Sequence, residues 1–116
     1  MAHTAGAALR LGIPADKLDR VWEFRTNAVF SEAERVALEF AMAAAAVPND
    51  VTDELFDEMK RHWSGGQIVE IAAVVALFGF MNRWNDSMAT PLEEEPIEVG
   101  EKHLAQHGWS VGKHSG

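Results

Sequence analysis

The sequence predicts an all-α protein, a compact helical bundle of about five helices with a long buried central helix. Three observations predict it. Capping signals precede segments with a helical spacing of apolar residues, no segment alternates polar and apolar residues as a strand does, and one long segment is apolar on every side. With 116 residues the chain has the length of one small domain.

The first part of the chain predicts two short helices. Residues Ala2 to Leu11 are rich in alanine and leucine and stop at Gly12, which suits the left-handed position after a helix. Pro14 then fits the first position of a second helix that runs to about Phe24.

Two further helices carry their own start signals. Ser31 followed by Glu34 is a capping box, and Pro48 ends the helix that it opens. Thr52 caps the next helix, which has an acidic first turn and a basic last turn, as the helix dipole favours. The buried stripe expected on this helix consists of Leu55, Phe56, Met59 and Trp63.

The central helix is predicted from Ser64 to Met88. Ser64 and Gln67 form its capping box, and from Ile71 to Met81 it is apolar on all sides, so it must be covered by protein or by lipid. The apolar run is shorter than the roughly 18 residues of a membrane span, and Glu70 interrupts just before it. We therefore expect a core helix. Because so small a domain cannot wrap it completely, we expect a homo-oligomer.

Charge and composition exclude several classes of protein. The net charge is -8 and the basic residues form no cluster, which argues against nucleic-acid binding. Arg10 interrupts the one apolar stretch near the start, so no leader is expected and we predict a cytoplasmic protein without membrane contact. The chain has no cysteine, which removes disulfides, thiolate metal sites and a cysteine nucleophile of its own. No metal and no cofactor are predicted.

The acidic stretch near the end suggests a change of organisation. Residues 91–100 read as a solvated linker, so the predicted division is a helical core of residues 1–92 and an acidic linker with a C-terminal tail, residues 93–116. This tail is expected to pack on the core or on a neighbouring subunit, with Trp109 pinned against it.

Polar residues close the central helix and give the first candidate site. Asn82, Asn85 and Asp86 share one helix face, and with Phe78 and Phe80 they could line a ligand pocket. The favoured alternative is a structural network that ties the helix end to a loop. Because a carboxylate opposes the dipole at a helix C-terminus, Asp86 should meet a donor, for example an arginine of this or another subunit.

The histidines are the second group of candidates. His103 and His107 have a helical spacing and His114 follows, so they could meet a metal, but exposed tail histidines are the commoner case. By composition alone, His3 is a frayed terminal residue.

Four segments together resemble one superfamily. They are His3 to Pro14, Phe30 to Leu38, Trp63 to Asp86 and Gly108 to His114, and they cover nearly the whole chain. In this order the segments resemble the carboxymuconolactone decarboxylase and alkyl hydroperoxidase D superfamily.

The resemblance implies an all-helical fold of the alkyl hydroperoxidase D-like type that assembles as dimers, trimers or hexamers. In the peroxidase-like branch a Cys-x-x-Cys pair opens a helix, a histidine follows a few residues later, and an upstream glutamate completes a proton relay. Only the histidine carries over, as His3, which becomes the one catalytic candidate. The register places the second cysteine just before Met1, so the chain resembles a member without its Cys-x-x-Cys segment.

The implied function is thiol-dependent reduction of hydroperoxides, with this cysteine-free chain inactive in that chemistry as given. The alternative is a non-catalytic oligomeric scaffold or a protein that binds a small apolar ligand. A decarboxylase of acidic lactones ranks third, because the chain is acidic and only Arg10 or Arg83 could face such a substrate.

Overall fold

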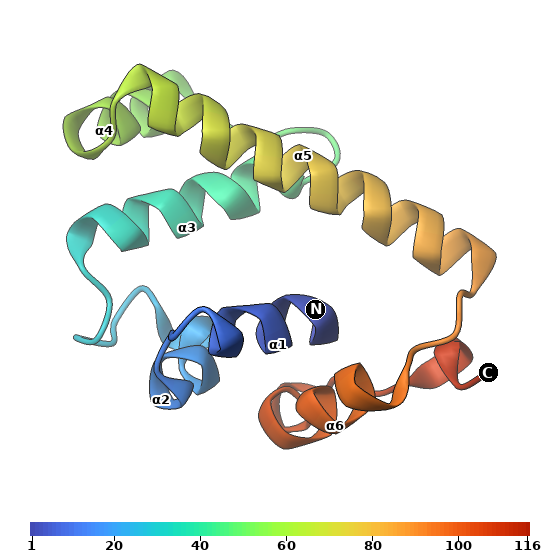
Figure 1. The fold of residues 1–116 in the computed structure, drawn as a ribbon. Helices are drawn as coiled ribbons and strands as arrows, with labels where there is room; N and C mark the ends of the chain where they lie inside the picture. Colours follow the sequence, from blue (N-terminus) through green and yellow to red (C-terminus); the bar gives the residue numbers. More distant parts are fainter. The chain divides into compact units, whose positions relative to one another are not determined.

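The computed structural model describes all 116 residues and contains only helices, which confirms the predicted fold class (Figure 1). The chain divides into two compact units. We call residues 24–85 the central unit, and we call residues 1–23 together with residues 86–116 the terminal unit. Each unit is described by itself.

The helices follow the expected order along the chain. They are α1 (Ala2–Arg10), α2 (Ala15–Asp19), α3 (Glu32–Ala45), α4 (Asp53–His62), α5 (Gly65–Met88) and α6 (Glu94–His103), with short 3-10 helices at Val21–Glu23, Ala105–His107 and Gly112–His114.

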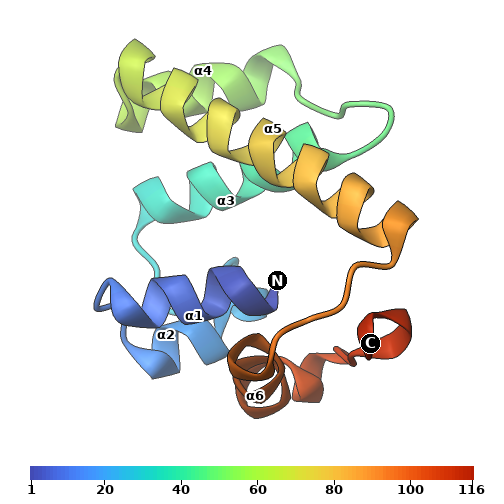
Figure 2. The ribbon, with the colours of Figure 1, turned by 45° about the vertical axis from the view of Figure 1, so that its right-hand side comes forward.

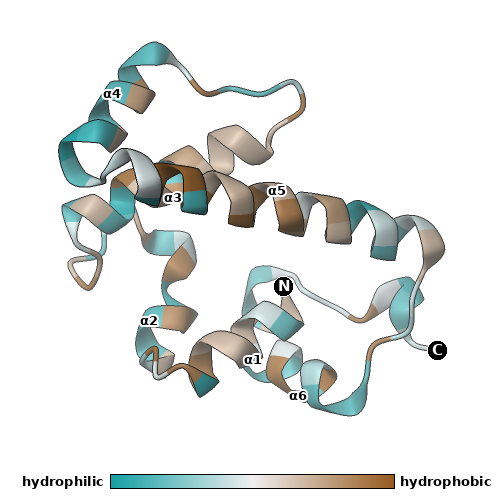
Figure 3. Ribbon diagram, turned by 45° about the horizontal axis from the view of Figure 1, so that its top comes forward, coloured by the Kyte–Doolittle hydropathy of each residue, from teal (hydrophilic) through white to brown (hydrophobic).

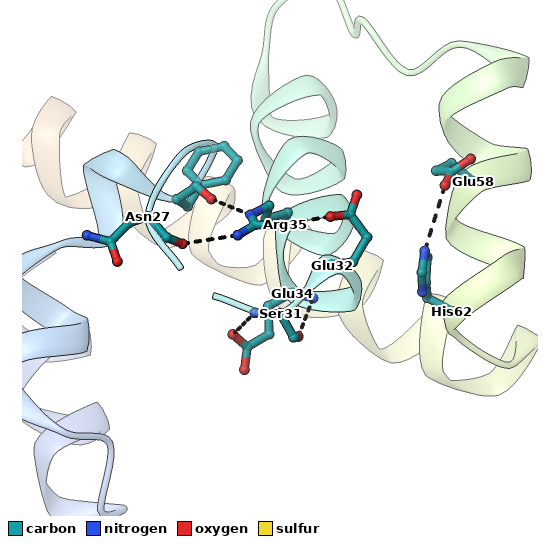
Figure 4. A network of polar contacts seen from close by, with 8 residues as sticks. Asn27, Ser31, Glu32, Glu34, Arg35, Glu58 and His62 are labelled. Carbon is teal, nitrogen blue, oxygen red and sulfur yellow. Dashed lines mark hydrogen bonds and ion pairs between the residues drawn. The ribbon is translucent and has the colours of Figure 1, made fainter. Parts of the chain in front are cut away.

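The helix starts of the central unit are those that the sequence predicts. The Ser31 hydroxyl accepts a hydrogen bond from the backbone N–H of Glu34, whose carboxylate accepts one from the N–H of Ser31, both at 3.1 Å (Figure 4). Thr52 caps α4 through the N–H of Leu55 at 3.2 Å. Ser64 and Gln67 form a second reciprocal box at the start of α5.

The core of the central unit lies where α3, α4 and the start of α5 meet. Its buried residues are Val36, Phe40, Met59 and Ile68. Trp63 packs against this cluster, and its indole Nε1–H donates to the carbonyl oxygen of Ala33 at 3.0 Å, so its one polar atom is satisfied.

An arginine ties the start of the central unit to α3. Arg35 donates to the carbonyl oxygens of Phe24 and Asn27, at 3.1 and 3.2 Å, and pairs with Glu32 on its own helix (Figure 4). The guanidinium group thereby gives two loop carbonyl oxygens the hydrogen-bond donors that no helix provides for them.

The long helix α5 exists as predicted, and the single chain buries little of it. Only Ile68 is buried, although apolar residues run along most of the helix (Figure 3). The large apolar side chains exposed on it are Val69, Val74, Leu77, Phe80, Met81, Trp84 and Met88. One chain of this size does not supply enough surface to cover a helix that is apolar all round.

The same helix is the one segment long and apolar enough to cross a membrane, judged by length and composition only. The prediction that it is too short is therefore wrong, because apolar residues outside Ile71 to Met81 extend the run. This is weak evidence for a span, since core helices of soluble proteins pass the same test.

The terminal unit contains the main correction to the sequence prediction. Most of the stretch 91–100, expected to be a linker, belongs to helix α6, which packs against α1 (Figures 1 and 2). Acidic side chains stabilise a helix start through the dipole, and Glu94 and Glu95 occupy the first turn. Pro96 is tolerated in this turn because the first N–H groups of a helix have no partner within the helix, so the missing N–H of proline breaks no hydrogen bond. The acidic composition therefore marks a helix N-terminus.

Trp109 packs on a glycine of α6, which lies within the predicted tail of residues 93–116 and not on the predicted core. A Cβ atom on Gly100 would lie only 2.4 Å from the indole ring of Trp109. Gly100 is therefore required for this close approach of ring and helix.

Candidate functional site

His3 lies on the first turn of α1 and has a carboxylate partner. Its Nε2 is 2.8 Å from Oε2 of Glu93, the residue that precedes α6, and the two residues are 90 positions apart in the sequence. The side chains are 58% and 73% exposed, so the ring is accessible to a reacting molecule while one nitrogen is held. The expectation of a frayed residue is therefore wrong, whereas the catalytic role stays a prediction.

The charge of Glu93 decides which nitrogen of the His3 ring carries the hydrogen. The backbone N–H of Glu93 itself, followed by the imidazole of His3, holds the pKa of the Glu93 carboxyl below its ordinary value. The carboxylate is thus ionised at neutral pH and can only accept hydrogen bonds. Nε2 of His3 therefore carries the hydrogen, which leaves the lone pair of the neutral ring on Nδ1.

A second ion pair joins the same two helices. Arg10 at the end of α1 pairs with Glu95 in the first turn of α6. This pairing occupies one of the two arginines that a decarboxylase-type site would aim at an acidic substrate.

The pocket candidates lie on the last turns of α5. Phe78 is partly buried, whereas Phe80, Asn82 and Asn85 are exposed. Phe80 stacks on Trp84, with ring centroids 6.4 Å apart and an interplanar angle of 29°. The structure thus places an exposed aromatic pair beside the polar residues, and a ligand pocket there stays a prediction.

Asp86 belongs to the terminal unit and meets a donor there, the ammonium group of Lys113. Lys113 Nζ lies 3.1 Å and His114 Nε2 lies 3.7 Å from its Oδ1. The ring of His114 is held in turn by the carbonyl oxygen of Thr90 at 2.8 Å. A donor was expected, but it comes from the C-terminal tail instead of an arginine, and the arrangement fits the structural alternative for Asp86.

Sequence reasoning missed one buried polar cluster. His103 Nδ1 is 2.6 Å from Oδ1 of Asp19 on α2, and the histidine side chain is only 7% exposed. His107 Nε2–H donates to the backbone carbonyl of Asp19 at 3.1 Å, and its ring packs on Trp22. The expectation of exposed tail histidines is therefore wrong for His103. The helical spacing of His103 and His107 indicated that they share a face. No nearby residue indicated that Asp19 would be their partner.

An all-helical chain with an accessible histidine–carboxylate pair is similar to an enzyme of known structure, the debrominase Bmp8. Its solved structures include an apo form and a cysteine-to-alanine variant in complex with 2,3,4-tribromopyrrole. The identity is 37%, the TM-score is 0.80, and the match covers 87% of this chain and 54% of Bmp8.

A second relative is known by sequence. The uncharacterised protein YnjA of Escherichia coli (strain K12) is 34% identical over 79 residues, which are 68% of this chain and 43% of YnjA. The chain thus spans about half the length of the relatives that it matches. No model of a known protein family matches the chain.

Proposed function

We propose that this chain is the base-bearing helical part of a thiol-dependent enzyme of the alkyl hydroperoxidase D-like superfamily, acting on small organic molecules in the cytoplasm. The observation that carries the proposal is the accessible ring of His3, held through Nε2 by Glu93 at 2.8 Å. Similarity to Bmp8, an enzyme with a described cysteine variant and a small halogenated ligand, supports it.

The role of His3 in such a reaction is that of a general base. A thiolate, and not a thiol, attacks a peroxide, so a neighbouring base that removes the thiol proton speeds the reaction. The balanced reaction consumes two thiols and one hydroperoxide and yields one alcohol, one water and one disulfide. An external dithiol then returns the disulfide to two thiols.

The same two thiols could serve a second substrate class, which the similarity to Bmp8 favours. In a reductive dehalogenation, one carbon–bromine bond and two thiols are replaced by one carbon–hydrogen bond, one hydrogen bromide and one disulfide. Both reactions need a thiolate, a base and a dithiol reductant, and they differ only in the bond that is cleaved.

The first test of the proposal is the gene. This chain contains no cysteine, so the enzymatic role requires codons for two cysteines with Cys-x-x-Cys spacing in frame before Met1. A gene without them would overturn the enzymatic role.

The second test uses the gene product that carries these thiols, with dithiothreitol as reductant. We expect turnover of cumene hydroperoxide or release of bromide from 2,3,4-tribromopyrrole, which distinguishes the two substrate classes. His3→Gln should lower kcat by on the order of 100-fold, the usual contribution of a general base. His62→Gln is the matched control, because His62 lies in the central unit and contacts Glu58. Unchanged turnover in His3→Gln would show that His3 is not the base.

The rival function is a non-catalytic scaffold or a binder of small apolar ligands, with a site near Phe78, Phe80, Asn82 and Asn85. The exposed stack of Phe80 on Trp84 favours a flat aromatic ligand, since rings prefer offset stacking. In this role, 2,3,4-tribromopyrrole should shift the Trp84 indole resonance, and Phe80→Ala should abolish the shift. No shift at saturating ligand would count against this site.

Homo-oligomerisation belongs to both functions and is proposed here from the surface of α5. Its exposed apolar residues include Val74, Leu77 and Phe80. Exposed apolar patches of this kind mark interfaces. Light scattering after size exclusion should give a multiple of 12.8 kDa, and Phe80→Asp should lower the mass. Val47→Asp is the control, because Val47 is also exposed but lies outside α5. A folded wild-type monomer would overturn the oligomer.

A further inference from the structure

We propose that Glu93 is the positioning residue of His3: its carboxylate holds the ring by Nε2, so that Nδ1 is the nitrogen that accepts the proton in the reaction. The inference rests on the proposed function and deepens it, because it names the reacting atom of the base and the residue that selects it.

The placement of Glu93 follows from the packing of two helices. α1 and α6 are in contact, with Gly6 and Val99 facing each other, and His3 and Glu93 lie at the same end of this contact. Glu93 occupies the N-cap position of α6, where the free backbone N–H groups favour a negative charge. Its carboxylate is therefore charged and lies 2.8 Å from Nε2 of the ring.

The chemistry of the pair selects one ring nitrogen. An ionised carboxylate accepts hydrogen bonds only, so the hydrogen of the neutral imidazole resides on Nε2. Once Nδ1 takes a proton from a thiol, the ring becomes positive, and the carboxylate 2.8 Å from Nε2 stabilises that charge. Glu93 thus aids the step without touching the substrate.

The neighbouring acidic residue provides a control. Glu95 lies two positions further along the chain, in the first turn of α6, and pairs with Arg10. Glu95→Gln removes one carboxylate from the same helix end and leaves the partner of His3 in place. Any effect of overall charge should appear in both variants, and any effect of positioning only in Glu93→Gln.

The first experiment reads the reacting nitrogen directly and needs neither a thiol nor a substrate. The 116-residue chain is alkylated with iodoacetamide at mildly alkaline pH, and the positional isomer formed at His3 is identified after proteolysis. We expect Nδ1 to be the major site in the wild type and in Glu95→Gln, and Nε2 to be the major site in Glu93→Gln. Glu93→Asp, which keeps the carboxylate, should partly restore Nδ1. The same isomer ratio in the wild type and in Glu93→Gln would overturn the inference.

The second experiment separates positioning from a mere surface ion pair, since exposed pairs contribute little to stability. In the thiol-bearing gene product, Glu93→Gln should lower kcat by about tenfold with KM unchanged, a part of the general-base contribution. An unchanged kcat together with the isomer switch would reduce Glu93 to a surface partner and overturn the inference. A gene product without thiol turnover would remove the proposed function, while the isomer ratio still decides which residue holds His3.

Discussion

The central and terminal units differ in how far apart their interacting residues lie in the sequence. In the central unit, the helix starts depend on partners three positions apart, such as Ser31 with Glu34. In the terminal unit, the decisive pairs join residues 90 and 84 positions apart, His3 with Glu93 and Asp19 with His103. Local chemistry therefore specifies the helix starts of the central unit, whereas the terminal unit forms only once both ends of the chain have met.

The largest effect is expected in the core of the central unit. Met59 has no exposed surface, so Met59→Ala should lower the free energy of unfolding by about 3 kcal/mol through lost burial and the cavity that remains. Urea unfolding followed by circular dichroism measures it. Met42→Ala is the control, because Met42 is 55% exposed on α3 and alanine favours a helix. Equal losses in both variants would show that this core is not where the unit is stabilised.

The terminal unit should be most sensitive at its buried pair. Asp19→Ala leaves Nδ1 of the buried His103 without its carboxylate partner, which should cost about 2 kcal/mol. Asp16→Ala on the same short helix is the control, because Asp16 is exposed. The comparison of the two units predicts that Asp19→Ala loosens α6 in hydrogen exchange and leaves α3 and α4 protected. Uniform loss of protection would mean that the units unfold together.

These two residues show what the sequence can and cannot reveal. Met59 was predicted to be buried because it lies on the apolar stripe of a capped helix, a pattern contained within one turn or two. Asp19 gave no such signal, since its partner is brought to it only by the packing of α6. For the same reason His3 was assigned to a site by family resemblance alone, and Glu93 was assigned to a linker. Composition marked the acidic stretch correctly but did not distinguish a solvated linker from a helix N-terminus.

A third comparison uses two glycines of the terminal unit. Gly100→Ala places a Cβ within 2.4 Å of the Trp109 ring, and the overpacking should cost about 2 kcal/mol, more than the gain in helix propensity. At Gly6 the added Cβ would meet only ordinary contacts, 3.5 Å or longer, so Gly6→Ala should stabilise by up to about 1 kcal/mol. Thermal unfolding and tryptophan emission measure both. Stabilisation by Gly100→Ala would show that Trp109 does not pack on α6.

The capping box offers a smaller and purely local effect. Ser31→Ala removes the acceptor for the N–H of Glu34 and should cost about 1 kcal/mol. Ser110→Ala, in an exposed segment outside the helices, should change the free energy of unfolding by less than about 0.5 kcal/mol. Urea unfolding of the two variants is sufficient to compare them. A loss at Ser110 as large as at Ser31 would contradict the contribution of the capping box to stability.

The smallest effect is a dependence on pH at the candidate site. The pKa of Glu93 is lowered in the folded chain, so its stabilising contribution is complete above the ordinary value of 4.5 and is lost as the pH falls through the folded pKa. The difference in unfolding free energy between the wild type and Glu93→Gln that comes from this shift should therefore stay constant above pH 4.5 and shrink as the pH falls below it. In a His3→Gln background this pH-dependent difference should become smaller but persist, because the backbone N–H of Glu93 lowers the pKa more than His3 does. Its complete disappearance would show that His3, 90 positions away, lowers the pKa of Glu93 more than the local backbone N–H does.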